Sequence, residues 1–350
     1  MTRNLYLGAN LAPAIGAPSL EAFVAANGQI LREVTANDFP TRARGLAREI
    51  REQEPDLVGL QEVALWRTAP PSLAPLQTGP SATTVRYDYL QSLLDELNRG
   101  NGKSGKGKPR YEVVVVQQEF DLEAPADENG VAGDNPANPA IPNAEINGRL
   151  TMRDVILARS DGGVHTWNAQ GGNFANLLTV PILGNPLTIA RGWTATDARV
   201  RGSGTFRFVN IHLEAFDPAA LVPSIRAKQA GELVAPGGPA TTDLPVILLG
   251  DLNSDDDTVA PGDRQAYEAL VAAGMVERST ATPLSCCLNS SLLAVGAGGS
   301  VADFDHQVDH VMTRDPDQVR LRSSTVTGLF PVDGFWSSDH AGVFSSLSLR

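Results

Sequence analysis

The chain has 350 residues, of which 42% are hydrophobic, so it can bury a large core. No linker divides it, and we expect a single domain over residues 1–350. Its 28 basic and 40 acidic residues give a formal net charge of −12, which disfavours nonspecific binding of polyanions through bulk charge. No run of about 18 apolar residues is present, which excludes a membrane-spanning helix.

The two cysteines, Cys286 and Cys287, are neighbours in the sequence, so they cannot close an ordinary disulfide loop. We expect two buried thiols, and a strained bond between the neighbours is the alternative. Met1 leads almost directly into a strand-like segment without a signal-peptide pattern. This start fits a cytoplasmic protein, or a secreted one whose leader has been removed.

The first half of the chain alternates between helical and strand-like patterns, as expected for a mixed α/β protein. After a strand at residues 4–7, three helices are predicted: one capped by Ser19, one from Thr41 to before Pro55, and one from near Thr84 to Asn98 with Val85 facing inward. Residues 56–63 between the last two helices have the composition of a buried strand.

Two long polar segments are predicted to be loops. Residues 100–109 carry glycine and lysine without apolar residues, which is typical of a surface connection. Residues 121–148, rich in Pro, Asn and acids, separate predicted strands at 113–116 and 154–158. Loops of this length in a compact domain are functional or disordered.

The second half begins with a predicted β-hairpin, in which strands 193–200 and 205–213 flank a turn. The two-residue period of the second strand places Phe206, Phe208, Asn210 and His212 on one face. The pattern is completed by two helices, near 224–234 and 263–273, and by three strands. One strand carries Asp251, and the other two lie at 308–312 and 342–349.

Polar side chains with acid, base or metal-ligand chemistry recur where these strands end. They are Asn4, Glu62, His212, Asp251, Asn253, Asp309 and the pair Asp339-His340. Each alone has an ordinary explanation, such as a solvated carboxylate or a core histidine. A sheet that ends several strands in such groups at one edge, however, has the elements of a reaction site.

Asp251 and Asn253 are two residues apart, so they project to the same side if strand geometry persists to Asn253. One would carry charge, and the other would offer a neutral amide to an oxyanion. Taken alone, this segment favours an Asx turn, because Asp-x-Asn-Ser is also ordinary turn chemistry. Asp309 follows a short apolar run and could orient His340 as a general base.

These motifs resemble the endonuclease/exonuclease/phosphatase superfamily of metal-dependent phosphoesterases. The matching segments, in order, are Asn4, Leu60-Gln61-Glu62-Val63, Asn210-Ile211-His212-Leu213, Gly250-Asp251-Leu252-Asn253, Gln307-Val308-Asp309-His310-Val311 and Ser338-Asp339-His340. Each motif is weak alone, and six in register over nearly the whole chain are specific. The resemblance implies an α/β fold, a four-layer α/β/β/α sandwich of two packed β-sheets flanked by helices.

The resemblance also implies a metal site. Glu62 would be the principal ligand of Mg²⁺, with Mn²⁺ or Ca²⁺ as alternatives, and Asn4 and Asp339 would complete or support the metal shell. Mg²⁺ takes a sparse set of oxygen ligands and keeps several waters, so one glutamate with helpers is sufficient.

The remaining matched positions would act on the phosphoester. His340, oriented by Asp309, would polarise the attacking water or bind a phosphoryl oxygen, and Asp251 is the competing candidate for activating that water. Asn253 and His212 would contact phosphoryl oxygens, and His212 is also a candidate acid for the leaving group.

The chain departs from its relatives at several positions. Tyr6 stands where some repair nucleases carry an aspartate, so a ligand of that type is missing. We expect Arg153, with Arg159 as the alternative, to replace the phosphate-contacting residues of relatives, although either arginine could form only a salt bridge. Glu119 could support His212, but we favour an exposed acid at a strand end.

The implied reaction is metal-assisted hydrolysis of a phosphoester by in-line attack of water, without a covalent enzyme intermediate. We favour a phosphodiesterase, either nuclease-like or acting on phospholipid headgroups, and expect a monomer. A phosphomonoesterase acting on inositol phosphates or other small phosphates and a non-catalytic binding module are the alternatives. Acidic secreted nucleases occur in this superfamily, so the negative charge does not exclude DNA, and secretion is favoured over a cytoplasmic location.

Overall fold

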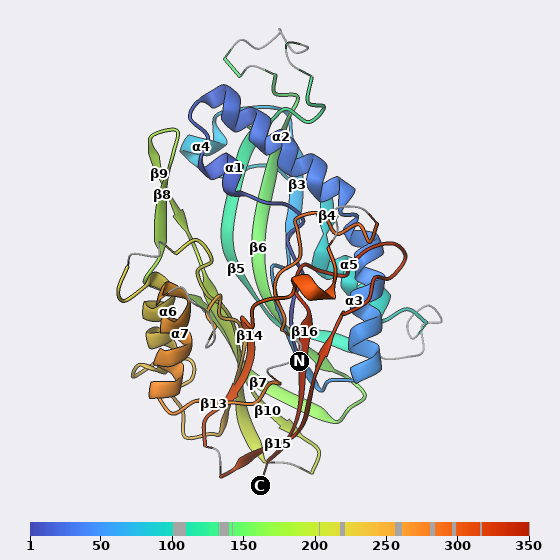
Figure 1. Ribbon diagram of the computed structural model, residues 1–350, viewed down its shortest axis with the longest axis vertical. Coiled ribbons are helices and arrows are strands. Elements are labelled where there is room, and N and C mark those ends of the chain that lie inside the picture. Colours follow the sequence, from blue (N-terminus) through green and yellow to red (C-terminus); the bar gives the residue numbers. More distant parts are fainter. Residues whose placement is uncertain are drawn as a thin grey trace.

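The computed structural model folds the chain into two packed β-sheets with helices outside (Figure 1). It describes residues 1–100, 110–131, 133, 140–141, 143–202, 204–217, 221–255, 261–280, 284–295, 299–315 and 317–349, with the backbone alone for 261–263. The predicted surface connection at 100–109 lies outside the described residues except for Gly100.

The first sheet has eight strands in the order β15, β16, β1, β2, β6, β3 and β4, with β5 paired to β6. Their bounds are β1 (Thr2–Asn4), β2 (Leu57–Gln61), β3 (Leu65–Ala69), β4 (Thr84–Asp88), β5 (Tyr111–Ala126), β6 (Ile146–Arg159), β15 (Val319–Thr327) and β16 (Gly342–Leu349). The central strands β1 and β2 run parallel, with Asn4 opposite Gln61. Asn4 and Glu62 therefore emerge at the same edge of this sheet.

The second sheet has six strands in the order β13, β14, β12, β11, β10 and β7. Their bounds are β7 (Val164–Asn173), β10 (Gly192–Val200), β11 (Thr205–His212), β12 (Val246–Asp251), β13 (Val276–Glu277) and β14 (Asp309–Thr313). The predicted hairpin is confirmed, since β10 and β11 are antiparallel neighbours. A separate hairpin of β8 (Leu178–Ile182) and β9 (Asn185–Ile189) projects beyond this sheet (Figure 1).

Seven α-helices are found in the described part of the chain. They are α1 (Ala12–Ile15), α2 (Leu20–Ala36), α3 (Phe39–Gln53), α4 (Pro75–Thr78), α5 (Tyr89–Leu97), α6 (Ile225–Val234) and α7 (Pro261–Ala272). Ser19 caps α2 as predicted, because its hydroxyl accepts from the Ala22 amide. None of the helices described is both long enough and apolar enough to cross a bilayer.

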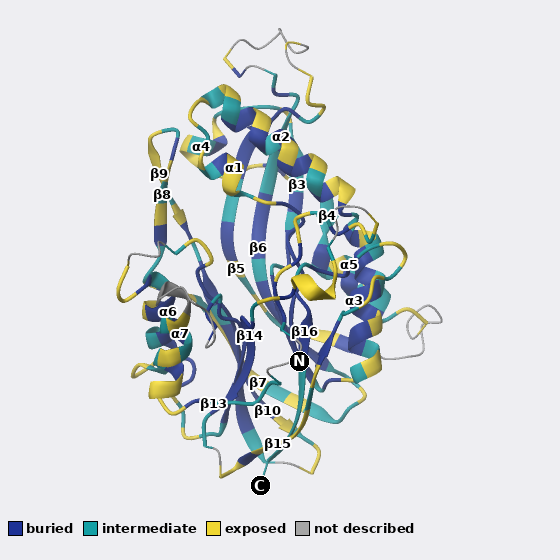
Figure 2. Ribbon diagram, viewed as in Figure 1, coloured by how far each residue is buried: buried dark blue, intermediate teal, exposed yellow. Residues whose placement is uncertain are grey.

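Buried side chains gather in three main layers, and Figure 2 shows the buried inner faces of strands and helices that form them. Residues of α2, α3 and α5 pack on the first sheet through side chains such as Phe23, Leu46 and Leu93. Phe208, Leu249 and Val343 lie between the sheets, and Leu233, Leu270 and Met312 join α6 and α7 to the second sheet. The four-layer α/β/β/α sandwich is therefore confirmed.

The two sheets approach closely at Gly59 of β2. A Cβ atom there would lie 2.4 Å from Leu249 Cδ1 and 2.5 Å from Asn210 Oδ1 of the opposite sheet. The Asn210 side chain crosses between the sheets, because its Nδ2 donates to the Leu60 carbonyl at 3.2 Å and its Oδ1 accepts from Gln61. A polar bridge thus fixes the spacing of the sheets one residue from the edge that carries Glu62.

Three predictions about the first sheet are wrong. The strand expected at residues 4–7 lies at Thr2–Asn4, so it ends where the prediction begins. The helix expected from Thr84 begins only at Tyr89, because residues 84–88 form β4 against β3, and Val85 is exposed. The loop expected at 121–148 is shorter, because β5 and β6 extend as a paired ribbon into it. Polar residues suit this ribbon, since Asp121 and Arg149 form a cross-strand ion pair at 2.6 Å.

Candidate active site

Three strands of the second sheet bring polar side chains into one row. The parallel pair β11 and β12 places His212 opposite Asp251, and the antiparallel pair β12 and β14 places Asp251 opposite Asp309. All three side chains are almost completely buried. The sheet register alone therefore assembles an imidazole and two carboxylates from distant parts of the sequence.

Asp251 lies at the centre of the site. Its Oδ2 accepts from Asn4 Nδ2 at 2.9 Å and lies 3.6 Å from His212 Nε2 and 3.7 Å from His340 Nε2. Its Oδ1 accepts from the Asn253 backbone amide at 2.9 Å. One carboxylate thus contacts both sheets and faces two imidazoles.

The two imidazoles differ in charge because their surroundings differ. His340 Nδ1 lies 2.8 Å from Asp309 Oδ2. Burial opposes the charged form of His340, but Asp309 and Asp251 together hold its pKa well above the ordinary value. Burial and the Arg191 guanidinium hold the pKa of His212 well below its ordinary value. Burial also raises the pKa of the Asp251 carboxyl to about 6.

Glu62 and Asp339 lie together on the rim of the first sheet. Glu62 follows β2 with a left-handed backbone (φ 52°), and its Oε2 accepts from the Leu7 amide at 2.7 Å. Burial and the neighbouring Glu62 charge raise the pKa of Asp339 to about 7. Glu62 and Asp339 line the same cavity and His340 follows Asp339 in the chain, so Glu62 and His340 lie on the same side of the molecule.

The donor set formed by Glu62, Asp339 and Asn4 fits a hard divalent cation. It offers two carboxylates and an amide oxygen, the ligand type that Mg²⁺ prefers. The mutual repulsion of the two carboxylates is the kind of interaction that a bound cation relieves. The Asn4 Oδ1 already accepts from the Tyr6 amide at 2.8 Å, so it is the weaker candidate ligand.

Tight clusters of metal-ligand side chains lie further inside the described structure. Asp251, Asp309 and His340 form one, and Glu119, Asp154 and His212 form another, each with ligand atoms within 4.8 Å of one another. These residues offer further positions for a cation beside Glu62 and Asp339.

The Endonuclease/Exonuclease/phosphatase family model matches residues 26–340. The chain belongs to this family. Its members are phosphoesterase hydrolases, which generally use divalent metal ions. No match was found among curated proteins.

Solved structures agree in fold. A family member from Bacteroides thetaiotaomicron has a TM-score of 0.54 at 15% identity, covering 100% of this chain and 96% of its own. A mannosyl-6-phosphatase from the same species has a TM-score of 0.51 at 15% identity, covering 99% and 98%. TDP2 from D. rerio, complexed with a single-strand DNA product, has a TM-score of 0.51 at 16% identity, covering 89% and 93%. At such identities these structures show the fold alone.

Arg191 is buried at the candidate site of this family member. The sequence patterns did not predict that it lies there. Its Nη1 lies 3.1 Å from His212 Nδ1, and its Nε lies 3.9 Å from Glu214 Oε2. It precedes Gly192, which pairs with His212 across the hairpin. Only the register of the hairpin could have predicted this position, because Arg191 is the residue next to the one that pairs with His212.

Glu119 is buried, so the exposed position favoured from the sequence is wrong. Burial raises the pKa of Glu119 to about 7, and burial together with the Glu119 charge raises the pKa of Asp154 well above its ordinary value. Carboxyl oxygens of the pair lie within 4.8 Å of each other, so ionisation of one carboxyl disfavours ionisation of the other. The pair lies next to His212.

Arg153 points away from this cluster, because neighbouring residues of a strand project to opposite faces and Asp154 faces His212. Its Nε donates to the Val63 carbonyl at 2.9 Å, and its Nη2 pairs with Asp88 at 2.7 Å. Its predicted role in binding substrate stays a prediction. The alternative, Arg159, pairs with Asp56 at 3.0 Å.

Asn253 is not on a strand. Strand β12 ends at Asp251, Asn253 has a left-handed backbone (φ 47°), and its amide closes an Asx turn onto Asp251. The condition for the two side chains to project from one strand face is therefore not met, and the Asx turn that the sequence also predicted is confirmed. Asn253 still lies beside Asp251, and its Nδ2 donates to the Leu213 carbonyl at 3.0 Å.

Cys286 and Cys287 are joined in a disulfide, so the expectation of two thiols is wrong. Cys286 is buried and Cys287 is exposed. Their sulfur atoms lie 3.7 and 3.9 Å from His340 Nε2. The segment contacts the site because the backbones of residues 285 and 288 hydrogen-bond to those of residues 341 and 339.

Proposed function

We propose that this chain is a divalent-metal-dependent phosphodiesterase in which Asp251 activates the attacking water. The observation that best supports the proposal is the position of Asp251 Oδ2. It lies between His212 and His340 and is held by Asn4, on the same rim as Glu62. A general base must be a fixed acceptor within reach of a water beside the phosphorus, and this carboxylate meets that condition.

Glu62 and Asp339, supported by Asn4, would hold Mg²⁺ or a similar ion. When bound, the ion would polarise a phosphoryl oxygen and offset the negative charge that develops on it. The proximity of these two half-buried carboxylates and the raised pKa of Asp339 support this assignment.

The reaction needs one proton acceptor and one proton donor. The water oxygen forms a bond to phosphorus while its proton passes to Asp251, and the bond from phosphorus to the leaving oxygen breaks in line. His340 has a carboxylate facing each ring nitrogen, Asp309 at 2.8 Å and Asp251 at 3.7 Å, which favours the imidazolium. His340 would therefore bind a phosphoryl oxygen and supply the proton for the leaving alcohol.

The charge of the site favours a diester over a monoester. Four carboxyl groups gather at the candidate site, from Glu62, Asp251, Asp309 and Asp339, whereas Arg191 is the arginine in contact with His212. A phosphodiester carries one negative charge and a monoester at neutral pH carries about two. The dianion is therefore repelled more strongly.

The test compares bis(4-nitrophenyl) phosphate with 4-nitrophenyl phosphate in Mg²⁺, Mn²⁺, Ca²⁺ and chelator. We expect metal-dependent hydrolysis of the diester, and a fall in kcat/KM of about 10²- to 10⁴-fold in Asp251→Asn and His340→Gln. Asp333→Asn, which changes an exposed carboxylate in the same way, is the matched control. Preference for the monoester, activity in chelator, or full activity of Asp251→Asn would each refute the proposal.

A further inference from the structure

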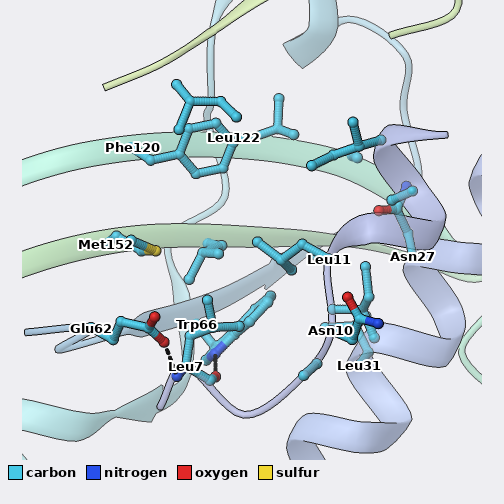
Figure 3. Close-up of a pocket in the computed structure, with 18 of the residues that line it drawn as sticks. Leu7, Asn10, Leu11, Asn27, Leu31, Glu62, Trp66, Phe120, Leu122 and Met152 are labelled. Atoms are coloured by element: carbon cyan, nitrogen blue, oxygen red, sulfur yellow. Dashed lines mark hydrogen bonds between the residues drawn. The ribbon is translucent and has the colours of Figure 1, made fainter. Parts of the chain in front are cut away.

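An apolar cavity of about 410 Å³ opens beside the candidate metal ligands. Glu62 lies at one end of the lining, and Asn10 and Asn27 lie at the other (Figure 3). Asp339 is also part of the lining. Between these ends the close-up shows the side chains of Leu7, Leu11, Leu31, Phe120, Leu122 and Met152. The cavity therefore runs from a polar reaction centre through a long apolar section.

The walls of the cavity come from four parts of the fold. Strands β5 and β6 form one wall, and the helices α1 and α2 form another. Trp66 of β3 closes one side and is held in place because its Nε1 donates to the Leu7 carbonyl at 3.0 Å. The projecting β8–β9 hairpin contributes Ile182, Leu187 and Ile189 to the remaining side.

A space of this size is not a packing defect. Protein interiors are packed as densely as organic crystals, and voids larger than a water molecule are few. Ligand sites have volumes of about 300–1,000 Å³, are mainly apolar and carry a few polar groups at one point, which describes this cavity. Apolar walls of this kind favour an apolar ligand, because burying both surfaces from water lowers the free energy.

We infer that this cavity holds a hydrocarbon chain of the substrate, so that the enzyme cleaves a phosphodiester amphiphile. The inference rests on the proposed function, because the chain must be attached to the phosphorus that lies between Glu62 and Asp251. Water-sized groups take about 30 Å³ each, so the cavity has room for one chain of roughly ten carbons. Such a chain belongs to an alkyl or prenyl phosphodiester in solution or to a lipid in a membrane.

A nucleic acid fits the cavity less well. Its phosphates on either side of the scissile bond would require cationic side chains, and the cavity lining includes one arginine, Arg191, which already contacts His212. The net charge of −12 adds to this disfavour.

The experiment uses 4-nitrophenyl alkyl phosphates with methyl, butyl, octyl and dodecyl chains, below their micelle concentrations, in Mg²⁺. We expect kcat/KM to rise about threefold per methylene and to level off beyond roughly ten carbons. Vesicles of phosphatidylcholine and a DNA oligonucleotide are assayed in parallel. Turnover of the vesicles identifies a membrane lipid as the source of the chain, and turnover of the octyl ester alone identifies a soluble one.

Two substitutions fill the cavity from opposite walls. Ala124→Phe on β5 and Ala14→Phe on α1 should remove the dependence on chain length and leave the methyl ester unaffected. Ala25→Phe, on the exposed face of α2, is the matched control and should keep the dependence. Because the methyl ester reports on folding within each variant, a loss confined to long chains cannot arise from unfolding.

Binding of octyl phosphate and methyl phosphate, measured by calorimetry, separates this inference from the proposed function. Tighter binding of octyl phosphate with a negative heat-capacity change, abolished by Ala124→Phe, supports the cavity assignment even if no ester is hydrolysed. Hydrolysis of the methyl ester without chain dependence or octyl binding overturns the cavity assignment and leaves the phosphodiesterase standing. Faster cleavage of the oligonucleotide than of the octyl ester also overturns it.

Discussion

Asp309 Oδ2 lies 2.8 Å from His340 Nδ1, and this contact fixes the direction of the imidazole. The carboxylate requires an N–H at Nδ1, so Nε2 points to Asp251 and the phosphoryl position. Both side chains are buried, which shields this bond from solvent. Asp309 thus acts through His340, as a positioning residue.

The variant Asp309→Asn should keep the shape of this pair and lose its charge. We expect kcat/KM for a diester to fall about 10²- to 10⁴-fold with little change in KM, as for the loss of an acid or base in its working form. The ¹⁵N chemical shifts of His340 should also change toward a neutral ring. Asp305→Asn at the exposed Asp305-His306 pair is the matched control, and equal losses in both variants would contradict the role of Asp309.

Removing the Glu62 charge should weaken metal binding more than it affects the stability of the fold. In Glu62→Gln we expect the Mg²⁺ concentration for half-maximal activity to rise at least about tenfold, and Mn²⁺ binding measured by calorimetry to weaken equally. Glu52→Gln changes an exposed glutamate on α3 and should alter neither. Unchanged Mn²⁺ affinity in Glu62→Gln would place the cation elsewhere, for example among Asp251, Asp309 and His340.

The sequence predicted those candidate site residues that lie directly at the ends of strands. His212, Asp251 and Asp309 each border a short apolar strand, and a strand end is visible in the sequence because alternation stops there. Their assembly required only that the strands be neighbours in one sheet. For Asn253 the sequence left two conformations open, because a strand and an Asx turn share the same residues at this point.

The residues that were missed depend on which strands pair and in which register. Choosing between Arg153 and Asp154 requires knowing which face of β6 meets the second sheet, and Arg191 is placed only by its partner across the hairpin. Val85 lies in a five-residue segment whose strand conformation comes from pairing with β3. The apolar cavity is lined by segments far apart in the chain, so no local pattern could predict it.

His310 and Glu277 should make stability depend on pH. His310 Nδ1 lies 2.6 Å from Glu277 Oε2, and Nε2 lies 3.0 Å from the Ser254 carbonyl, so both ring nitrogens face acceptors. Burial opposes both charges, but the pair raises the pKa of His310 above its ordinary 6.5 and lowers that of Glu277 below 4.5. The contribution of His310 is complete below pH 6.5 and is lost as the pH rises through its raised pKa. The contribution of Glu277 is complete above pH 4.5 and is lost as the pH falls through its lowered pKa.

Glu277→Gln should therefore lower the free energy of unfolding most between about pH 4.5 and 6.5, and less at pH 9. Urea unfolding at pH 5.5 and pH 9 measures the difference. Glu268→Gln, which changes an exposed ion pair on α7, should show no such dependence. A larger loss at pH 9 than at pH 5.5 would mean that His310 is neutral in the folded protein.

Arg42 should be essential for the position of two segments at the site. From α3 it donates to the carbonyls of Leu5 at 2.8 Å, Tyr6 at 3.1 Å and Ser337 at 3.0 Å. Arg42→Met keeps most of the buried volume and leaves these carbonyls without their donor, so we expect a loss of about 3–5 kcal/mol in stability. Denaturant unfolding measures it, with the exposed Arg48→Met as control. A loss below about 1 kcal/mol would show that water replaces the guanidinium.

Gly59→Ala should be destabilising because the sheets leave no room for a side chain there. Its Cβ would lie 2.4 Å from Leu249 Cδ1 and 2.5 Å from Asn210 Oδ1, and neither side chain moves freely. Leu249 is buried between the sheets, and Asn210 is held by the Leu60 carbonyl and Thr194. We expect a loss of about 1–3 kcal/mol, typical of an overpacked core, measured by urea unfolding.

Gly231→Ala is the matched control for this substitution. It lies inside α6 with nothing within 4 Å of its added Cβ, so alanine should stabilise the protein by about 0.5–1 kcal/mol through its better helix propensity. Opposite signs for the two substitutions would show that the close approach of the sheets, and not the loss of a glycine, determines the effect. If Gly59→Ala were as stable as the parent, Asn210 would have to move, and with it the polar bridge that fixes the spacing of the sheets next to Glu62.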